Sequence, residues 1–240
     1  MHKGHIYWNN KDSYDLGIIV EQVPNLNKPQ RKYDTYTVPG RSGVIIEQQD
    51  AYDNIEKSYN IWFAVDKFYK DLYSPQKAAQ VASWLYSVNG YSRLEDNFEP
   101  DIYRKAYFVG PLNIENHMQK YGICEITFNC RPEHYLKVGE SFIENPNILR
   151  NPTTFNAKPL IKVEGSGNVY FIIQGQRVDI TGLQDYIYLD CDAQDAYRQP
   201  AENKNSMITG NFPIIYPGDN SVVKSSGITK LSIQPNYWTL

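Results

Sequence analysis

Short apolar runs separated by turn residues dominate the first half of the chain. Ile18–Val20 and residues 33–38 have the β-branched and aromatic character of strands. The sequence Pro39-Gly40-Arg41-Ser42-Gly43 predicts a tight turn, and Val44-Ile45-Ile46 predicts a returning strand. This pattern is typical of a β-hairpin. A denser apolar run at residues 59–65 predicts a strand that is covered on at least one face.

One segment, residues 75–89, has a helical pattern. Ser74 suits the N-cap, Pro75 suits the first helical position and Gly90 suits a left-handed stop. Trp84 widens an apolar stripe that should lie against a sheet, and core packing explains this tryptophan better than ligand binding. The stripe consists of Ala78, Val81, Ala82, Leu85 and Val88.

Three further strands are predicted after the helix, at residues 103–109, 112–115 and 122–130. In the third strand two sets of residues alternate, and the more apolar set should face inward. That set is Cys124, Ile126, Phe128 and Cys130. An antiparallel sheet with one packed helix is therefore expected for residues 1–137.

The composition changes between residues 138 and 159, where asparagine, proline, glutamate and threonine accumulate. We interpret residues 138–159 as a linker and residues 160–240 as a second domain. Strands are predicted in the second domain, with Gly165-Ser166-Gly167-Asn168 and Gln174-Gly175-Gln176 as hairpin loops. The predicted strands are residues 160–163, 169–173, 177–180, 186–191 and 228–233. The fold class is therefore mainly β with one α-helix, ending in a small β-sandwich.

Composition excludes several classes of function. The chain has 240 residues, of which 41% are hydrophobic and 21% are charged, and its net charge of −3 argues against nucleic acid as a partner. No apolar run approaches the length of a membrane helix, so we expect no membrane insertion. The polar N-terminus lacks a secretory signal, and synthesis in the cytoplasm is expected. The 20 tyrosines suit half-exposed strands and protein interfaces.

No group of residues forms a recognisable catalytic site. The three cysteines are too few for a disulfide scaffold, and Cys124 and Cys130 are expected to be small buried side chains. The histidines and cysteines match no zinc spacing, and the acidic run from Asp190 to Asp195 lacks the glycine and glutamate of a calcium loop. We therefore predict no catalytic residue, no metal site and no cofactor. Asp96, Glu99 and Asp101 leave a wall-degrading hydrolase as a minor alternative.

A series of turn and strand-end motifs resembles the distal tail proteins (Dit) of long-tailed, non-contractile bacteriophages. The motifs span nearly the whole chain, and each is weak alone. In the first domain they are Ser13-Tyr14-Asp15-Leu16-Gly17, Val38-Pro39-Gly40-Arg41-Ser42-Gly43, Trp84-Leu85 with Gly90, Leu94-Glu95-Asp96, residues 101–106 and residues 128–132. In the second they are Asn151-Pro152-Thr153, residues 157–161, Gly165-Ser166-Gly167, residues 210–213, residues 217–220 and Tyr237-Trp238.

The resemblance implies a virion structural protein at the tail tip. Its first domains would form a homo-hexameric ring, and its second domains would be galectin-like or carbohydrate-module-like β-sandwiches. Such a ring joins the tail tube protein to the tail-tip hub protein, and in many phages it anchors receptor-binding proteins. No extra sugar-binding module fits in a chain of this length.

Two sets of contact residues follow from these hypotheses. The hairpin is the candidate for contact between copies in the ring, with Tyr36, Pro39, Gly40, Arg41 and Gly43 as its contact residues. The alternative function is a carbohydrate-binding adhesin that recognises host cell-wall glycan. Its sugar-stacking candidates are Tyr170, Tyr186, Tyr188 and Trp238.

Overall fold

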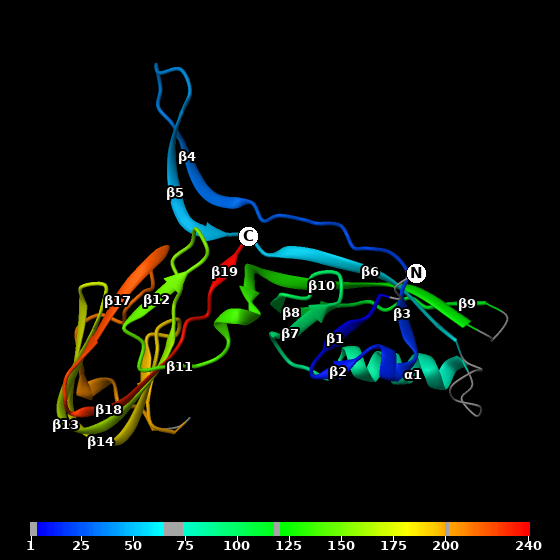
Figure 1. Ribbon diagram of the computed structural model, residues 1–240. Helices are drawn as coiled ribbons and strands as arrows, with labels where there is room; N and C mark the ends of the chain where they lie inside the picture. The colour runs from blue at the N-terminus through cyan, green and yellow to red at the C-terminus, as the bar shows by residue number, and fades with distance from the viewer. Residues whose placement is uncertain (1–3, 65–73, 118–120, 200–201) are drawn as a thin grey trace. The chain divides into compact units, whose positions relative to one another are not determined.

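The computed structural model describes residues 4–64, 74–117, 121–199 and 202–240. The chain divides into two compact units, Met1–His134 with Leu240, and Tyr135–Thr239. Both units are mainly β, which confirms the predicted fold class (Figure 1). No helix among the described residues is long and apolar enough to cross a membrane.

The first unit contains one antiparallel sheet with the strand order β2-β1-β7-β8-β10-β6-β3, and β9 pairs with β10. A short 3-10 helix, Tyr14–Leu16, precedes β3. The strands are β1 (Ile6–Trp8), β2 (Lys11–Asp12), β3 (Ile18–Val20), β6 (Ile55–Ala64), β7 (Ser92–Asp96), β8 (Ile102–Val109), β9 (Glu115–His117) and β10 (Tyr121–Leu136).

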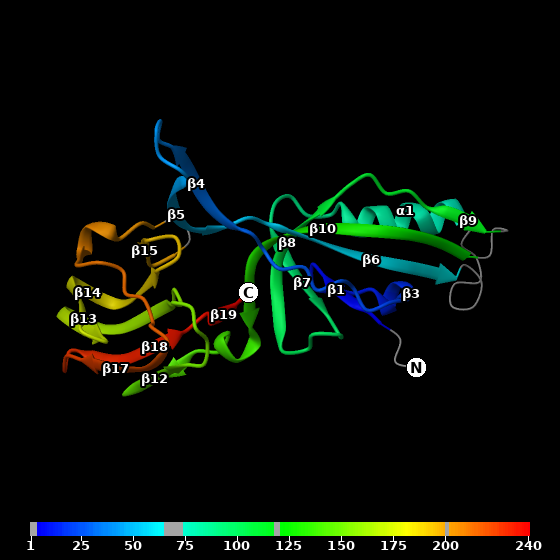
Figure 2. The ribbon, with the colours of Figure 1, turned by 90° about the horizontal axis from the view of Figure 1, so that it is seen from above.

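Helix α1 (Ser74–Leu85) lies along one face of this sheet (Figures 1 and 2). Its buried apolar side chains, Val81, Trp84 and Leu85, join one core cluster with the inward residues of β6 and β10. The inward alternation predicted for β10 is confirmed, since Cys124, Ile126, Phe128 and Cys130 are all buried. Trp84 is a core residue, as expected.

The helix ends four residues before the predicted end at Asn89. The Ser87 hydroxyl donates to the Trp84 carbonyl at 2.8 Å, and the Trp8 indole donates to the Leu85 carbonyl at 3.3 Å. These side chains satisfy carbonyls that another helical turn would have used. Gly90 is left-handed, with a φ of 86°, but it lies in the loop beyond the helix.

The strand predicted at residues 112–115 is wrong in its position. Residues 111–114 form no strand, and β9 begins at Glu115. Leu112 and Ile114 are partly buried against the core cluster of the first unit. Their apolar character reflects side-chain packing and not strand pairing. Val65, the last residue of the strand predicted at residues 59–65, lies outside the described residues.

The second unit is a sandwich built around two long, bent strands, β13 and β14 (Figure 2). β13 pairs with β18 through its first half and with β17 through its second half, so it contributes to both layers. The strands of the sandwich are β11 (Ile143–Glu144), β12 (Ile148–Asn151), β13 (Leu160–Ile173), β14 (Gln176–Asp190), β15 (Asp195–Tyr197), β16 (Ile208–Thr209), β17 (Gly218–Lys224) and β18 (Ile228–Gln234). The last short strand, β19 (Trp238–Thr239), pairs with β10. Two 3-10 helices, Lys137–Gly139 and Asn205–Met207, complete the unit.

The loop predicted at residues 165–168 is wrong. These residues lie inside β13, where the register shifts as a β-bulge between Gly167 and Val169. Gly165 is required there because a Cβ would collide with the carbonyl oxygen of Gly227, and Gly167 has a φ of 83°. The hairpin predicted at Gln174-Gly175 is present, joining Ile173 to Gln176.

Residues 138–159, expected to be a linker, contribute to the sandwich. β12 pairs with β17, and β11 pairs with β18. The asparagine side chains help to hold this irregular stretch, since Asn151 Nδ2 donates to the Phe155 carbonyl at 2.8 Å. An Asn- and Pro-rich composition therefore marks short, interrupted strands in this segment.

Candidate functional site

The predicted hairpin is present and forms a sheet of its own, β4 (Arg31–Thr37) paired with β5 (Val44–Tyr52). We call residues 31–52 the arm (Figure 1). Neither strand pairs with the larger sheets, and every residue of β4 is exposed. An isolated two-stranded hairpin is only marginally stable in water. Contact with another surface would therefore stabilise the arm.

The tip of the arm is a type II turn. The Arg41 backbone N–H donates to the Val38 carbonyl at 3.2 Å, Pro39 occupies the second position and Gly40 has a φ of 78° at the third. Gly43 is also left-handed, with a φ of 84°. All five contact candidates, Tyr36, Pro39, Gly40, Arg41 and Gly43, are exposed in the arm.

Both faces of the arm carry exposed apolar side chains. Tyr36 pairs with Ile45 on one face, where Val38 also lies. On the other face Val44 and Ile46 lie beside Thr37 and Thr35, with Tyr33 farther along the strand. Exposed fractions in this set run from 38% at Val38 to 58% at Ile46. Several exposed apolar side chains on one element are typical of a site of protein interaction.

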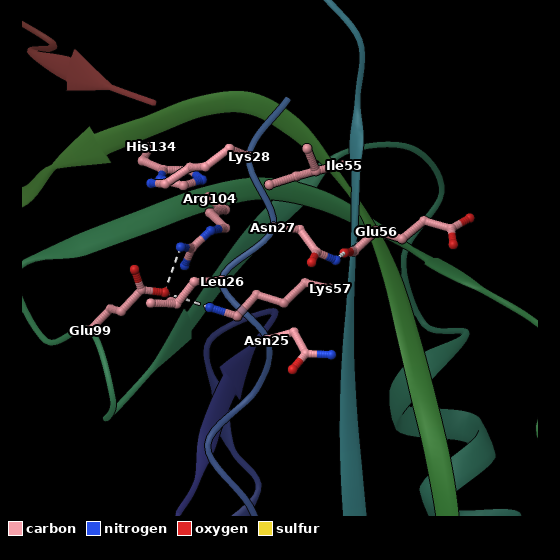
Figure 3. Close-up of a pocket in the computed structure, with 10 residues that line it drawn as sticks. All are labelled: Asn25, Leu26, Asn27, Lys28, Ile55, Glu56, Lys57, Glu99, Arg104 and His134. Atoms are coloured by element: carbon pink, nitrogen blue, oxygen red, sulfur yellow. Dashed lines mark hydrogen bonds and ion pairs between the residues drawn. The ribbon is translucent and has the colours of Figure 1, made fainter. Parts of the chain in front are cut away.

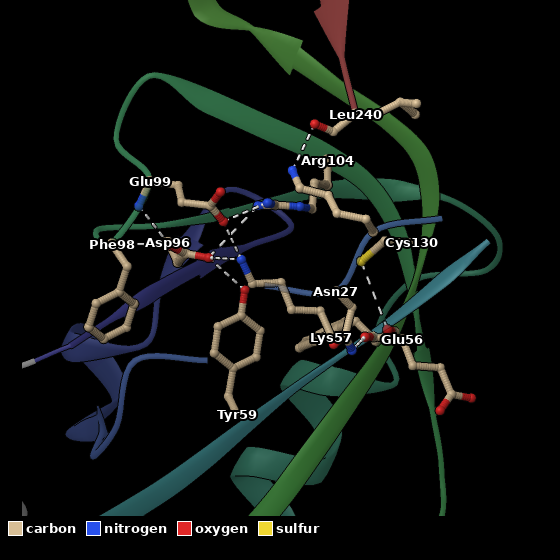
Figure 4. Close-up of polar contacts among 12 residues, drawn as sticks. Asn27, Glu56, Lys57, Tyr59, Asp96, Phe98, Glu99, Arg104, Cys130 and Leu240 are labelled. Carbon is tan, nitrogen blue, oxygen red and sulfur yellow. Dashed lines mark hydrogen bonds and ion pairs between the residues drawn. The ribbon is translucent and has the colours of Figure 1, made fainter. Parts of the chain in front are cut away.

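The first unit also contains a buried charge cluster, made of Lys57, Asp96, Glu99 and Arg104 (Figure 4). Lys57 Nζ lies 2.9 Å from Asp96 Oδ2 and 2.5 Å from Glu99 Oε2, and Arg104 Nη2 lies 2.5 Å from the same Glu99 oxygen. The Tyr59 hydroxyl donates to Asp96 Oδ2 at 2.8 Å. Each buried charge therefore has an opposite charge or a hydrogen-bond donor beside it.

The cluster changes the pKa of Glu99 and of the neighbouring His134. Burial raises the pKa of Glu99, but hydrogen bonds and positive charge from Lys57 and Arg104 outweigh it and lower this pKa to about 2. Burial, together with the nearby charge of Arg104, lowers the pKa of His134 to about 3. Near neutral pH, Glu99 is ionised and His134 is uncharged.

This geometry does not suit the hydrolase alternative. Asp96 is buried and paired with Lys57, and Asp101 is exposed at the other end of the acidic run. The cavity beside the cluster holds only about 10 Å³, which is too small for a sugar (Figure 3). Sequence reasoning missed Lys57, although its alternation with Ile55, Tyr59 and Ile61 places it on the inward face of β6.

The acidic run from Asp190 to Asp195 makes hydrogen bonds and an ion pair with neighbouring residues. Asp190 accepts hydrogen bonds from the backbone of Asp192 and Ala193, and Asp192 pairs with Lys158 at 3.1 Å. Asp195 accepts from Asn203 and Asn205, each at 2.9 Å. Across the described part of the chain, no three His, Cys, Asp or Glu side chains come together as a metal site would require.

The sugar-stacking candidates lie in the second unit, with neighbouring groups over their rings. Arg177 lies 4.1 Å from the Tyr170 ring centre, and Lys162 lies 5.1 Å from that of Tyr186. Tyr188 is stacked with Tyr197 at 5.6 Å. Trp238 is stacked on Phe155 at 4.4 Å, and its indole donates to the Asn156 carbonyl at 2.9 Å. The structure brings Tyr186 and Tyr188 together, with Tyr170 and Trp238 elsewhere in the unit.

The fold and the arm define a class of protein, namely two mainly antiparallel β units with one helix and a self-paired hairpin. A solved structure with the same fold is that of the SPP1 Dit (gp19.1) protein, described as a hub adsorption apparatus of phages that infect Gram-positive bacteria. The alignment covers 99% of each chain, with a TM-score of 0.74 and 12% sequence identity. The fold expected from the resemblance to distal tail proteins is thereby confirmed. No family model and no curated protein matches the sequence.

Proposed function

We propose that this chain is a structural protein of a phage tail tip, a distal tail protein whose copies form a ring. The observation that carries the proposal is a fold shared over 99% of both chains with a phage hub protein. The exposed arm supports it, because a ring needs one surface patch that docks on a different patch of the next copy. The resemblance to distal tail proteins implies six copies.

The arm is the element proposed to contact the next copy. Its outer strand edges are unpaired, so a neighbouring strand could add to either edge. Burial of Tyr36, Ile45 and Ile46 against a neighbour would remove apolar surface from water, which is the main driving force of association. Arg41 and the turn around Gly40 lie at the tip, where they would make the farthest contacts.

The ring would join the tail tube protein to the tail-tip hub protein and anchor receptor-binding proteins. The protein would be made in the host cytoplasm and end in the virion tail tip. The adhesin alternative has less support at the residues proposed for it, because charged or aromatic groups lie over the rings of Tyr170, Tyr186 and Trp238.

Native mass spectrometry of the full chain tests this proposal. We expect wild type to form a closed multimer and Ile45→Lys to shift it to single copies, because a charge on the arm would have to be buried in the interface. Val138→Lys is the matched control, since Val138 is 71% exposed but lies outside the arm. Single copies of wild type at all concentrations, or an intact multimer of Ile45→Lys, would contradict the proposal.

A further inference from the structure

Three tyrosines from separate segments surround one hollow in the first unit. Tyr86 follows the end of α1, Tyr91 lies in the loop before β7, and Tyr107 lies in β8. The hollow has a volume of about 440 Å³ and is completed by Leu85, Val88, Asn89, Gly90 and Phe108. We call it the tyrosine hollow. Its volume lies within the range of ligand sites in proteins.

The three tyrosines are more exposed than the tyrosines considered in the second unit. Tyr86 is 54% exposed, Tyr91 48% and Tyr107 37%, whereas Tyr170, Tyr186 and Tyr188 are only partly exposed. Each of the three side chains of the tyrosine hollow is therefore accessible to a molecule in solution. An exposed aromatic cluster of this kind is a surface on which another molecule can stack.

The rings of the tyrosine hollow are also held in place. Tyr86 makes an edge contact with Phe108 at 5.0 Å, and its hydroxyl lies against Gly110, where a Cβ would collide with it. Tyr91 makes an edge contact with Tyr107 at 5.4 Å, and its hydroxyl accepts a hydrogen bond from Asn54 Nδ2 at 2.7 Å. Side chains that are fixed before binding lose less entropy when a ligand arrives.

The chemistry of the lining indicates the class of ligand. No residue that lines the tyrosine hollow is charged. Arg131 lies 5.8 Å from the Tyr91 ring centre, outside the lining, and its charge is paired with Glu133 at 3.7 Å. Tyrosine hydroxyls and the Asn89 amide supply neutral hydrogen-bond groups around the rings. The ligand should therefore be uncharged, with an apolar face and a rim of hydroxyl groups.

We propose that the tyrosine hollow binds a neutral saccharide, with sugar rings stacked on Tyr91 and Tyr107 and hydroxyl groups bonded at the rim. A pyranose presents C–H groups on its faces and hydroxyls around its edge, which matches this arrangement. The inference goes beyond ring assembly and does not depend on it, because the tyrosine hollow contains no residue of the arm. It places sugar contact in the first unit, and not on the aromatic residues of the sandwich.

Isothermal titration of the full chain with neutral tetrasaccharides of glucose and of N-acetylglucosamine tests the inference. We expect saturable, weak binding of at least one of them, and at least tenfold weaker binding by Tyr91→Ala and by Tyr107→Ala. Tyr14→Ala is the matched control, because Tyr14 is 52% exposed in the same unit and lies outside the hollow. Unfolding curves of each variant show whether a loss of binding comes from loss of fold.

Three results would overturn the inference. The first is no saturable binding of either tetrasaccharide. The second is binding that survives Tyr91→Ala and Tyr107→Ala but is lost in Tyr188→Ala, which would place the sugar on the sandwich. The third is a change in self-association alone in Tyr91→Ala, which would make the hollow a protein contact. Sedimentation of the same samples measures self-association, so a failure to form the ring can be distinguished from a failure to bind sugar.

Discussion

Lys57 is 4% exposed on the inward face of β6, between Ile55 and Tyr59. A buried ammonium group is tolerated only when opposite charges compensate for lost hydration, and Asp96 and Glu99 supply them. Strand alternation predicts that Lys57 points inward. It does not predict its partners, because Asp96 and Glu99 come from β7 and the turn that follows, about 40 residues farther along the chain.

Lys57→Met should destabilise the first unit by about 3–5 kcal/mol, because it leaves the buried Asp96 and the partly buried Glu99 with one cation fewer. Chemical denaturation measures this free energy of unfolding. The comparison is Lys162→Met, which removes the partly exposed pair with Glu164 and should cost at most about 1 kcal/mol. Equal losses in the two variants would show that the buried cluster contributes no special stability.

Acid should lower the free energy of unfolding of the first unit over two overlapping pH ranges. The pKa of His134 is lowered to about 3, so its neutral form stabilises the fold above about pH 6.5, and this stability is lost as pH falls toward 3. The pKa of Glu99 is lowered to about 2, so its contribution is lost as pH falls from about 4.5 toward 2.

His134→Gln tests the first of these pH ranges. The variant removes the titrating group, so its unfolding free energy should vary less between pH 6.5 and pH 4.5 than that of wild type. Unfolding curves at a series of pH values measure this dependence. The same slope in both proteins would mean that another group titrates in this range.

At the scale of elements, the sequence predicts correctly those features that depend on interactions between residues close together in the chain. The alternation in β10, the start of α1 and the hairpin of the arm are all present, because side-chain period, capping and turn chemistry act within a few residues. The errors involve distant contacts. The end of α1 depends on the Trp8 indole, 77 residues from Leu85. The glycines at residues 165 and 167 predict a turn, but glycine is also common in a β-bulge, which is what they form in β13.

Gly165→Ala tests the account of the β13 bulge. An added Cβ would meet the Gly227 carbonyl oxygen, so β13 and β18 would have to separate locally. We expect a loss of roughly 2–3 kcal/mol in the stability of the second unit. Ser166→Ala, at an exposed neighbour, should change it by less than about 0.5 kcal/mol. Thermal unfolding followed by calorimetry distinguishes these outcomes.

At the scale of the whole molecule, the sequence allowed a two-part β fold to be predicted, but not the extent of the second unit. Residues 138–159 look like a linker because their strands are short and their partners, β17 and β18, lie about 70 or more residues away. The tyrosine hollow was missed for the same reason. Its rings come from three segments, and no spacing in the sequence connects them.

The arm should be dispensable for folding and required for assembly. Replacing residues 33–48 with a two-residue turn removes most of a hairpin that pairs only with itself, so the unfolding transitions of both units should stay close to wild type. The shortened chain should sediment as single copies. Loss of the folded state in this variant would show that the arm belongs to the core of the first unit.

Electron microscopy of the purified full chain tests the central proposal most directly, because images report both closure and symmetry. The proposed function predicts closed rings with rotational symmetry, six-fold if the resemblance to distal tail proteins holds for copy number. A field of separate single copies, at concentrations where sedimentation shows the protein to be folded and soluble, would contradict the proposal.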